Sequence, residues 1–346
     1  MTKIACLGGS FNPPHRGHLK IALAVLRQEH FEELWFIPTQ TTPLKDDQLA
    51  SFEDRVQMIM RLIKPYRKLK VCTIEESLPL PNYTINTVKA LTHNYPQYQF
   101  TWIMGSDQAN QFAAWKDADE LLKRINFLVI VRNETDQIPA VLKTLHVHQI
   151  AQISSTHIRN GKLSDTTDAV VRYMFDHELY LESIAKSMVS PARWAHVKAV
   201  KKLALELGNA HHLDPHPLKV AALFHDCTKN WKFEKAEKWI NFIDSSYLEQ
   251  PQGIWHQKTA ETYLRRAGVI DKTILQAIGH HVTGLKGHPI AQILYIADKC
   301  EPTRDYDVTQ ELVLAQTNLD KSALLVSRIQ KEYLQKDNNA NTTAPH

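Results

Sequence analysis

The residues of this chain whose types and spacing suit chemistry first occur at positions 8–18. Gly8 and Gly9 follow a short apolar run, and two prolines then precede His15 and His18, which stand three apart at the start of an amphipathic stretch. Glycines allow a tight turn and close approach of a ligand, and residues three apart share one face of a helix. A helix start also offers unpaired N–H groups to an anion. The pattern predicts a strand, a turn and a helix whose two imidazoles are directed at one phosphate.

Such an arrangement suits nucleotidyl transfer, in which a phosphate attacks the α-phosphate of a nucleoside triphosphate. Charge accumulates on the phosphate oxygens during this reaction, so the protein needs positioned hydrogen-bond donors rather than a nucleophile of its own. A bare H-x-G-H match could equally be a helix cap and a surface residue. The strand before it and the Gly-Gly-Ser-Phe-Asn-Pro-Pro lead-in favour the phosphate site.

Residues 8–18 resemble the signature of the nicotinate mononucleotide adenylyltransferase family, within the H-x-G-H nucleotidyltransferases. The stretches 104–107 and 153–159 extend this resemblance over the first half of the chain. It implies transfer of AMP from ATP, bound with Mg²⁺, to nicotinate mononucleotide, with His15 and His18 as catalytic residues. The resemblance also implies two sets of ligand contacts: nucleotide-binding Gly8, Gly9, Ser10, Phe11, Gly105, Asp107, Ser154, Ser155, Thr156 and Arg159, and acceptor-binding Lys45, Thr84 and Trp115.

Two positions near the residues expected to bind the acceptor nucleotide depart from the family pattern. Leu44 stands where the family usually has histidine, and Asn86 stands where it usually has aspartate. Asn86 keeps hydrogen bonding but lacks the charge, so its segment could be a structural cap as readily as a substrate contact. Trp115 could stack on the nicotinate ring or belong to the core. Nicotinamide mononucleotide, or the acceptor of another H-x-G-H transferase, is therefore an alternative.

A second group of chemistry-bearing residues lies in the later half of the chain, where apolar stretches have helical spacing. Imidazoles and carboxylates recur near the ends of these stretches: His196, His225, Asp226, His256, His281 and Asp298. Such ligands, converging from several helices, suit Fe, Mn or another divalent transition metal better than Ca²⁺. One histidine on a helix is more often a core or surface residue, but a series with a His-Asp dipeptide at its centre favours a metal site.

This series resembles the HD phosphohydrolase superfamily, and within it the bacterial HD-domain diadenosine tetraphosphatases, through residues 221–229, 277–284 and 296–304. The resemblance implies two divalent transition metals, Fe or Mn, which would activate a water and hold the attacked phosphate. One metal would bind His196, His225, Asp226 and Asp298, and the other His256 and His281, with Asp226 bridging. Lys229, as a catalytic residue, and Arg304 would neutralise the polyphosphate.

The implied reaction of this part is hydrolysis of a nucleoside polyphosphate, with diadenosine tetraphosphate giving two ADP. An inactive nucleotide-sensing domain and a hydrolase of another nucleotide phosphate are the alternatives. The resemblance does not address oligomeric state.

The elements that must position these residues differ between the two halves. Strand patterns at 4–7, 34–38, 69–72, 101–104, 127–131 and 149–153 alternate with helical patterns at 17–27, 52–63, 85–94, 118–124 and 140–145. This alternation predicts a Rossmann-like, doubly wound parallel α/β sheet over residues 1–180, with ligands at the carboxyl ends of the strands. After a linker at 181–190, helical patterns at 194–207, 218–225, 232–242, 258–267, 272–280, 289–298 and 310–334 predict an all-α HD-type domain over 191–334. Residues 335–346 are polar and predict a disordered tail.

Composition limits the remaining possibilities. At 346 residues the chain is long enough for two domains, and a formal net charge of +4 gives no support to binding of nucleic acid or of a membrane surface. No apolar run approaches the length that spans a bilayer. Four cysteines without C-x-x-C spacing, and no cationic apolar leader, predict a cytoplasmic location.

Overall fold

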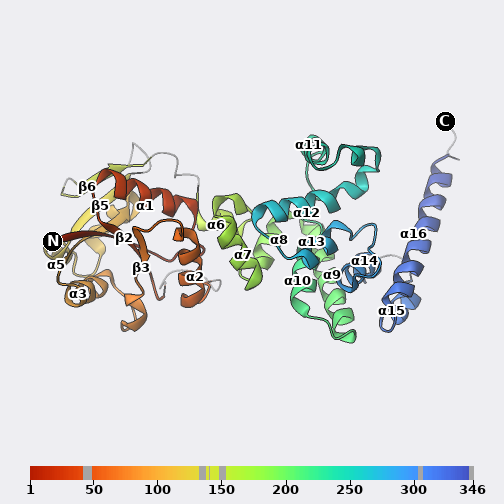
Figure 1. The fold of residues 1–346 in the computed structure, drawn as a ribbon, viewed down its shortest axis with the longest axis horizontal. Helices are drawn as coiled ribbons and strands as arrows, with labels where there is room; N and C mark the ends of the chain where they lie inside the picture. Colours follow the sequence, from red (N-terminus) through yellow and green to blue (C-terminus); the bar gives the residue numbers. More distant parts are fainter. Residues whose placement is uncertain (42–48, 132–137, 140, 148–152, 303–306, 343–346) are drawn as a thin grey trace. The chain divides into compact units, whose positions relative to one another are not determined.

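A computed structural model of the chain describes residues 1–41, 49–131, 138–139, 141–147, 153–302 and 307–342, and for residues 333–342 only the backbone. The chain divides into two compact units, Met1–Tyr173 and Met174–His346. Figure 1 shows strands only in the first of them. No described helix has the length and apolar character that crossing a membrane requires.

The first unit contains a six-stranded sheet in which every pairing is parallel (Figure 1). Its strands are β1 (Thr2–Gly9), β2 (Glu33–Pro38), β3 (Leu69–Val71), β4 (Tyr98–Gly105), β5 (Asn126–Val131) and β6 (Lys143–His146), and they lie in the order β3-β2-β1-β4-β5-β6. This is the doubly wound order, with β1 and β4 adjacent at its centre. The predicted fold class is therefore confirmed for this half.

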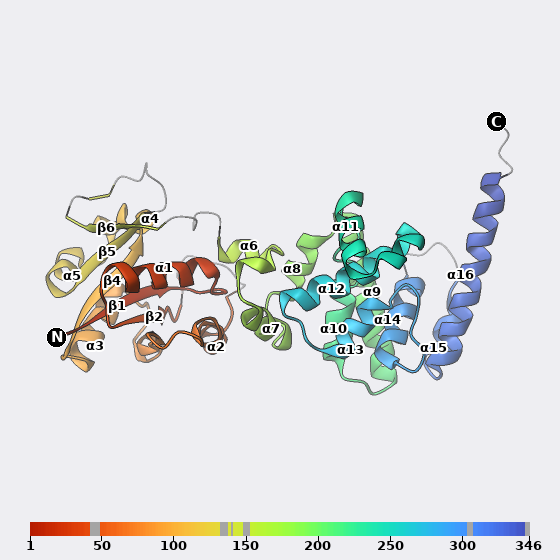
Figure 2. The same ribbon diagram turned by 45° about the horizontal axis from the view of Figure 1, so that its top comes forward.

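Helices connect the strands and follow the last of them. They are α1 (Arg16–Gln28), α2 (Phe52–Ile63), α3 (Thr84–Asn94), α4 (Ser106–Ala109), α5 (Ala118–Arg124), α6 (Ser155–Arg159) and α7 (Asp168–Asp176), with 3₁₀ turns at Ile74–Ser77, Phe112–Ala114 and Leu163–Asp165. Helix α1 runs beside the central strands (Figure 2). Alternate strand residues face a core cluster that includes residues of α3 and α5, among them Cys6, Trp102 and Leu121. Since neighbouring residues of a strand point to opposite faces, the strands are apolar on both sides and buried.

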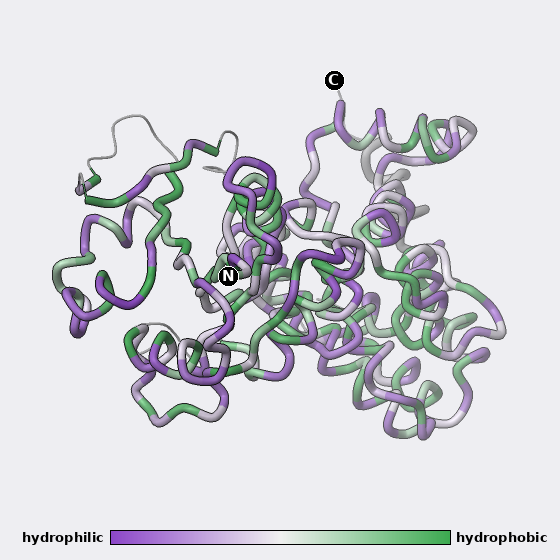
Figure 3. Tube along the Cα trace, turned by 60° about the vertical axis from the view of Figure 1, so that its left-hand side comes forward, coloured by the Kyte–Doolittle hydropathy of each residue, from purple (hydrophilic) through white to green (hydrophobic). Residues whose placement is uncertain are grey.

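The second unit is entirely helical in the part that the structure describes. Its helices are α8 (Leu181–Met188), α9 (Pro191–Ala210), α10 (Pro215–Phe224), α11 (Phe233–Ile243), α12 (Trp255–Ala267), α13 (Lys272–Gly279), α14 (Pro289–Cys300), α15 (Thr309–Ala315) and α16 (Leu319–Thr342), with 3₁₀ turns at Ser245–Glu249 and Gln252–Ile254. Hydrophobic and hydrophilic stretches alternate along the tube of these helices (Figure 3), as in amphipathic helices that share a core. Helices α9, α10, α13 and α14 pack on one another.

Several predicted elements are wrong. Residues 140–145 were expected to be helical because Leu142 and Leu145 are three apart, yet β6 forms there and pairs with β5, burying Leu145 and leaving Thr144 and His146 exposed. The expected linker at 181–190 contains α8, which buries Leu181 and two further apolar residues, and the division between the units falls earlier, after Tyr173.

The end of the chain also differs from the prediction. The single helix expected at 310–334 is two helices, because the Asn318 side chain accepts the N–H of Lys321 at 3.0 Å and starts α16 anew. Helix α16 then continues through residues 335–342, where disorder was predicted, since extending an existing helix costs far less than nucleating one. Of the strand expected at 149–153, all but Ile153 lies outside the described residues.

Candidate functional sites

The loop between β1 and α1 is held by buried contacts. A Cβ at Gly8 would lie 2.5 Å from the Trp102 ring, so only glycine fits at this point of the sheet. Phe11 is buried in the left-handed region at φ 49° and packs against Phe36 with ring centroids 5.4 Å apart. Arg55, which is 0% exposed, donates to the carbonyl oxygens of Ser10, Thr39, Gln40 and Ala50 at 2.7–3.1 Å. Arg55 therefore holds the loop in place through hydrogen bonds to backbone carbonyl oxygens.

His15 and His18 form a reciprocal cap at the start of α1. The N–H of His15 donates to His18 Nδ1 at 3.2 Å, and the N–H of His18 donates to His15 Nδ1 at 3.3 Å. Their rings stack with centroids 3.6 Å apart. Because each Nδ1 acts as an acceptor, the proton of each neutral ring lies on Nε2. The pair is thus set as two Nε2–H donors at the end of β1, as the predicted phosphate site requires.

The second stretch that was predicted to bind nucleotide contacts the same loop. Ser154 caps α6 by accepting the N–H of His157 at 3.2 Å, and Ser155 Oγ donates to the carbonyl oxygen of Pro13 at 2.8 Å. Arg159 donates to the carbonyl oxygen of Asn12 and lies 3.4 Å from Thr156 Oγ1. Residues about 140 positions apart in the sequence therefore lie together around residues 12–14.

Gly105 and Asp107 are the other residues of this unit that were predicted to bind nucleotide. Gly105 ends β4 two residues beyond Ile103, which pairs with Leu7, so it lies level with Gly9 at the carboxyl edge of the sheet. Asp107 is exposed on α4.

Of the predicted acceptor contacts, Thr84 and Trp115 lie within the described residues and Lys45 does not. Thr84 begins α3, and Trp115 is half-buried against Phe112, with ring centroids 5.4 Å apart, where it joins the core. Leu44 and Lys45 lie outside the described residues.

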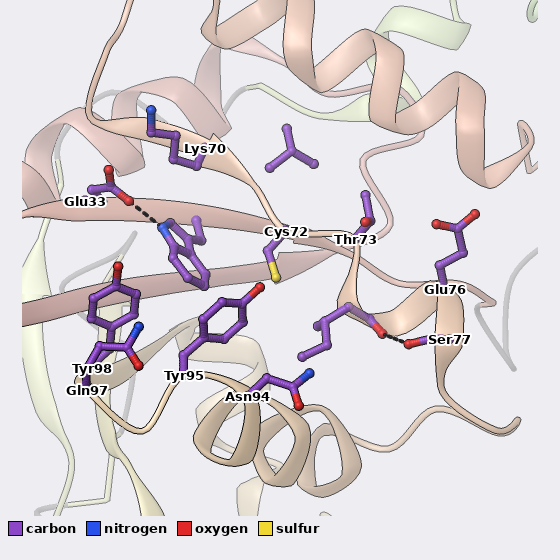
Figure 4. A pocket seen from close by; sticks show the side chains of 13 residues that line it. Glu33, Lys70, Cys72, Thr73, Glu76, Ser77, Asn94, Tyr95, Gln97 and Tyr98 are labelled. Carbon is purple, nitrogen blue, oxygen red and sulfur yellow. Dashed lines mark hydrogen bonds between the residues drawn. The ribbon is translucent and has the colours of Figure 1, made fainter.

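A pocket of about 760 Å³ in this unit lies apart from the predicted site (Figure 4). It is bordered by Trp35, Cys72, Tyr95 and Tyr98, and no residue predicted to bind nucleotide or acceptor lines it. Sequence reasoning also missed Glu75, which is buried and accepts from Thr87 Oγ1 at 2.8 Å. Burial raises the pKa of Glu75. This carboxylate holds the segment that contains Asn86 in place, which is a structural role.

In the second unit, five helices deliver the predicted metal ligands to one place. His196 lies on α9, His225 and Asp226 follow α10, His256 is the second residue of α12, His281 is the second residue after α13, and Asp298 lies on α14. All six side chains are buried.

These ligands form two sets. His196, His225 and Asp298 form one set, and Asp226, His256 and His281 form the other; within each set the ligand atoms lie within 4.8 Å of one another. In the first set, His196 Nε2 lies 3.0 Å from Asp298 Oδ1 and 3.4 Å from His225 Nε2. In the second set, His256 Nε2 lies 2.9 Å from His281 Nε2 and 3.1 Å from Asp226 Oδ1.

Asp226 faces both sets with different oxygens. Its Oδ1 lies 3.1 Å from His256 Nε2, whereas its Oδ2 lies 3.6 Å from His225 Nε2 and 3.9 Å from His196 Nε2. Burial would raise the pKa of Asp226, but the facing imidazoles hold that pKa well below its usual range. The carboxylate is thus ionised and placed between the two sets, as the predicted bridging role requires.

Burial also lowers the pKa of two imidazoles of the cluster. The pKa of His281 falls to about 4, and the pKa of His256 falls in the same direction. Both rings are therefore neutral near pH 7, and a neutral imidazole is the form that binds a metal.

Two residues beside the ligands were not predicted. Glu301 is buried and accepts from His196 Nδ1 at 3.1 Å, and Arg193 Nη1 lies 3.1 Å from Asp226 Oδ2. Glu301 follows Asp298 by three residues, and Arg193 precedes His196 by three. This spacing places each on the helix face of a ligand and could have identified both residues.

Lys229 reaches the cluster from the outer side of His256. Its Nζ donates to the carbonyl oxygen of Gly253 at 3.0 Å and lies 3.2 Å from His256 Nδ1, beside a cavity of about 200 Å³. Burial lowers the pKa of Lys229. Arg304 lies outside the described residues.

Comparison with known proteins agrees with this division. The cytidylyltransferase-like family matches residues 6–161, and the HD domain family matches residues 193–303. A Mycoplasma genitalium protein named "Probable nicotinate-nucleotide adenylyltransferase/Ap4A hydrolase" is 29% identical over 97% of this chain and 99% of its own length. Two proteins named "Probable nicotinate-nucleotide adenylyltransferase" match the first half: one from Oceanobacillus iheyensis, 35% identical over 52% of this chain and 97% of its own, and one from Porphyromonas gingivalis, 33% identical over 54% and 96%.

The first unit is thus a nucleotidyltransferase of the H-x-G-H type, and the second is an HD domain whose ligand set defines a divalent-metal site. The chain belongs to the nicotinate-nucleotide adenylyltransferase family. The predicted resemblances and the fold class of both halves are confirmed.

The buried ligand atoms of the second unit suit divalent metals. Imidazole nitrogens and carboxylate oxygens are ligands that Fe and Mn accept, and the two sets share one ionised carboxylate. Nδ1 of His225 and of His281 also faces a backbone carbonyl oxygen, which leaves Nε2 of each ring as the ligand atom.

Proposed function

We propose that the first unit transfers AMP from ATP-Mg²⁺ to nicotinate mononucleotide. An oxygen of the acceptor phosphate bonds to the α-phosphorus of ATP, the bond from that phosphorus to the β-bridging oxygen breaks, and pyrophosphate leaves with the electron pair. The products are nicotinate adenine dinucleotide and pyrophosphate. The observation that carries this proposal is the reciprocal cap of His15 and His18, which sets both rings as Nε2–H donors.

The other residues of this site act by positioning. Gly8 and Gly9 let the nucleotide approach the backbone, and Ser154, Ser155, Thr156 and Arg159 hold phosphate oxygens beside the loop that Ser155 and Arg159 contact. The two imidazoles donate to the oxygens on which charge develops, where preorganised donors have their largest effect. Comparing kcat/KM for nicotinate and nicotinamide mononucleotides tests the acceptor. A preference for the amide would refute this part of the proposal.

We further propose that the second unit hydrolyses diadenosine tetraphosphate to two ADP, using two Fe or Mn ions. Water adds to one of the two central phosphorus atoms, and the central P–O–P bond breaks, so each half leaves as ADP. Bound at these ligands, the metals would supply Lewis acidity to water and phosphate. Lys229 and Arg304 neutralise charge on the polyphosphate. The carrying observation is the pair of ligand sets that share Asp226.

The test uses the purified full chain, treated with chelator, reloaded with Mn²⁺ or Fe²⁺ and given diadenosine tetraphosphate. Metal-dependent formation of ADP alone, absent in Asp226→Ala, is expected. Formation of AMP and ATP would refute symmetrical cleavage. No turnover with metal bound would favour a nucleotide-sensing domain, and turnover of another nucleotide phosphate alone would change the substrate.

A further inference from the structure

The outer nitrogens of the four histidines have different partners. A histidine that binds a metal through Nε2 carries its proton on Nδ1, so Nδ1 then needs an acceptor. His225 and His281 have acceptors of the same kind: Nδ1 lies 2.8 Å from the carbonyl oxygen of Ala222 in one case and 2.7 Å from that of Ile278 in the other. Each half of the centre therefore has one histidine already set for metal binding.

The remaining histidine of the first set has a stronger acceptor. His196 Nδ1 lies 3.1 Å from Oε1 of Glu301, which is 1% exposed. A buried carboxylate fixes the ring and makes Nε2 a more basic ligand than a carbonyl partner does. This set also includes Asp298, whose Oδ1 lies 3.0 Å from His196 Nε2, and it faces Oδ2 of Asp226.

In the second set, Nδ1 of the remaining histidine lies beside a hydrogen-bond donor instead of an acceptor. His256 Nδ1 lies 3.2 Å from Lys229 Nζ, and an ammonium group has donors but no acceptor. Nδ1 is therefore the acceptor here, and the ring proton lies on Nε2, 3.1 Å from Asp226 Oδ1. If His256 bound a metal through Nε2, its proton would lie on Nδ1 and face a donor. Lys229 would then have to leave its place beside His256.

We propose that the two metals bind in order and with unequal affinity, an inference that rests on the proposed metal centre. The tight half-site is His196, His225 and Asp298, and it binds first, with Glu301 as its positioning residue. The weak half-site is His256 and His281, and it binds second because Lys229 must move. Asp226 is shared by both.

The test is a titration of the chelator-treated full chain with Mn²⁺ alone, in which free Mn²⁺ is measured by its electron paramagnetic resonance signal. Wild-type protein should bind two ions with dissociation constants at least about tenfold apart. His256→Gln should remove the weaker step and keep the tighter one. Glu301→Gln should weaken the tighter step by about 10- to 100-fold, as expected for loss of an outer-shell partner. Lys229→Met should tighten the weaker step.

Matched variants separate this role from a general effect on folding. Glu311→Gln changes another buried glutamate of the same unit, on α15, and should leave both steps unchanged. Glu301→Asp keeps a carboxylate and should recover part of the affinity that Glu301→Gln loses.

Three results would overturn the proposal: two equivalent steps, loss of the tighter step in His256→Gln, or an unchanged titration in Glu301→Gln. If Glu301→Gln does not fold by circular dichroism, the wild-type and His256→Gln titrations decide. Absence of any Mn²⁺ binding would refute the metal centre itself, and would be distinct from equal binding at both half-sites.

Discussion

Replacing His18 with alanine should separate catalysis from stability in the first unit. Alanine keeps the backbone N–H that donates to His15 Nδ1, whereas the variant loses the bond from the His15 N–H to the His18 ring and the ring contacts with His15 and Phe11. Loss of one capping bond costs about 1 kcal/mol of stability. Loss of a donor directed at transition-state charge lowers kcat about 100- to 1,000-fold, or about 3–4 kcal/mol. We therefore expect a nearly inactive enzyme that still folds.

The assay measures pyrophosphate release at saturating ATP and nicotinate mononucleotide, beside urea denaturation followed by circular dichroism. His18→Asn supplies an acceptor for the His15 N–H without an Nε2–H donor, so it should recover stability but not rate. His93→Ala, at an exposed histidine of α3, is the matched control and should change neither. A His18→Ala enzyme within tenfold of wild type, or recovery of the rate in His18→Asn, would refute the role of His18 as a transition-state donor.

Three further predictions concern other parts of the structure. Asp226→Asn should empty both half-sites by metal analysis and stop hydrolysis while pyrophosphate release stays unchanged; loss of both activities would mean that the units act as one. Arg55→Met should cost about 3–5 kcal/mol in urea denaturation, because four carbonyl oxygens lose their buried cationic donor; a loss below 1 kcal/mol would contradict this. Chelator-treated protein should lose about 3 kcal/mol as pH falls from 6.5 to 4, because the unfolded state protonates His281 at its ordinary pKa of 6.5 whereas the folded state does so at about 4. His281→Gln should reduce this loss in urea denaturation; His256, whose pKa is also lowered, adds to the loss in the same range, and His196, whose pKa is raised, changes stability only above pH 6.5 and cannot cancel it.

The sequence predicted elements best where local pattern and tertiary packing agree. The helices at Phe52–Ile63 and Ala118–Arg124 begin and end at the predicted residues, because their apolar positions repeat with helical spacing and face the sheet. The helix predicted at residues 140–145 was wrong because local pattern and tertiary packing disagree there. Leu142 and Leu145 fit a helix when taken alone, but the open edge of β5 offers backbone hydrogen bonds to this segment. Whether a segment forms an edge strand depends on the strand beside it. Local periodicity does not reveal that neighbouring strand.

The ligands of the metal centre could be predicted, whereas the contacts of their outer nitrogens could not. His225 and Asp226 are adjacent in the sequence, and the other ligands fall at helix ends, so the residue types alone indicate a site. Spacing could indicate Glu301, and Lys229 was predicted from the family resemblance, but neither indication says which nitrogen of which histidine the residue contacts. That contact depends on the packing of α9 on α14 and on the position of the turn at Gln252–Ile254, and these are features of the folded chain.

Both units use histidine, and the partner of Nδ1 decides what each ring can do. His15 and His18 lie at the start of α1, where backbone N–H groups lack helical partners, so Nδ1 accepts and Nε2 carries the proton. His225 and His281 lie just beyond the ends of α10 and α13, where carbonyl oxygens lack i+4 helical partners, so Nδ1 donates and Nε2 keeps its lone pair. The first arrangement suits a phosphate and the second suits a metal ion. For these four histidines, the position relative to the helix end thus selects between the two chemistries before any ligand binds.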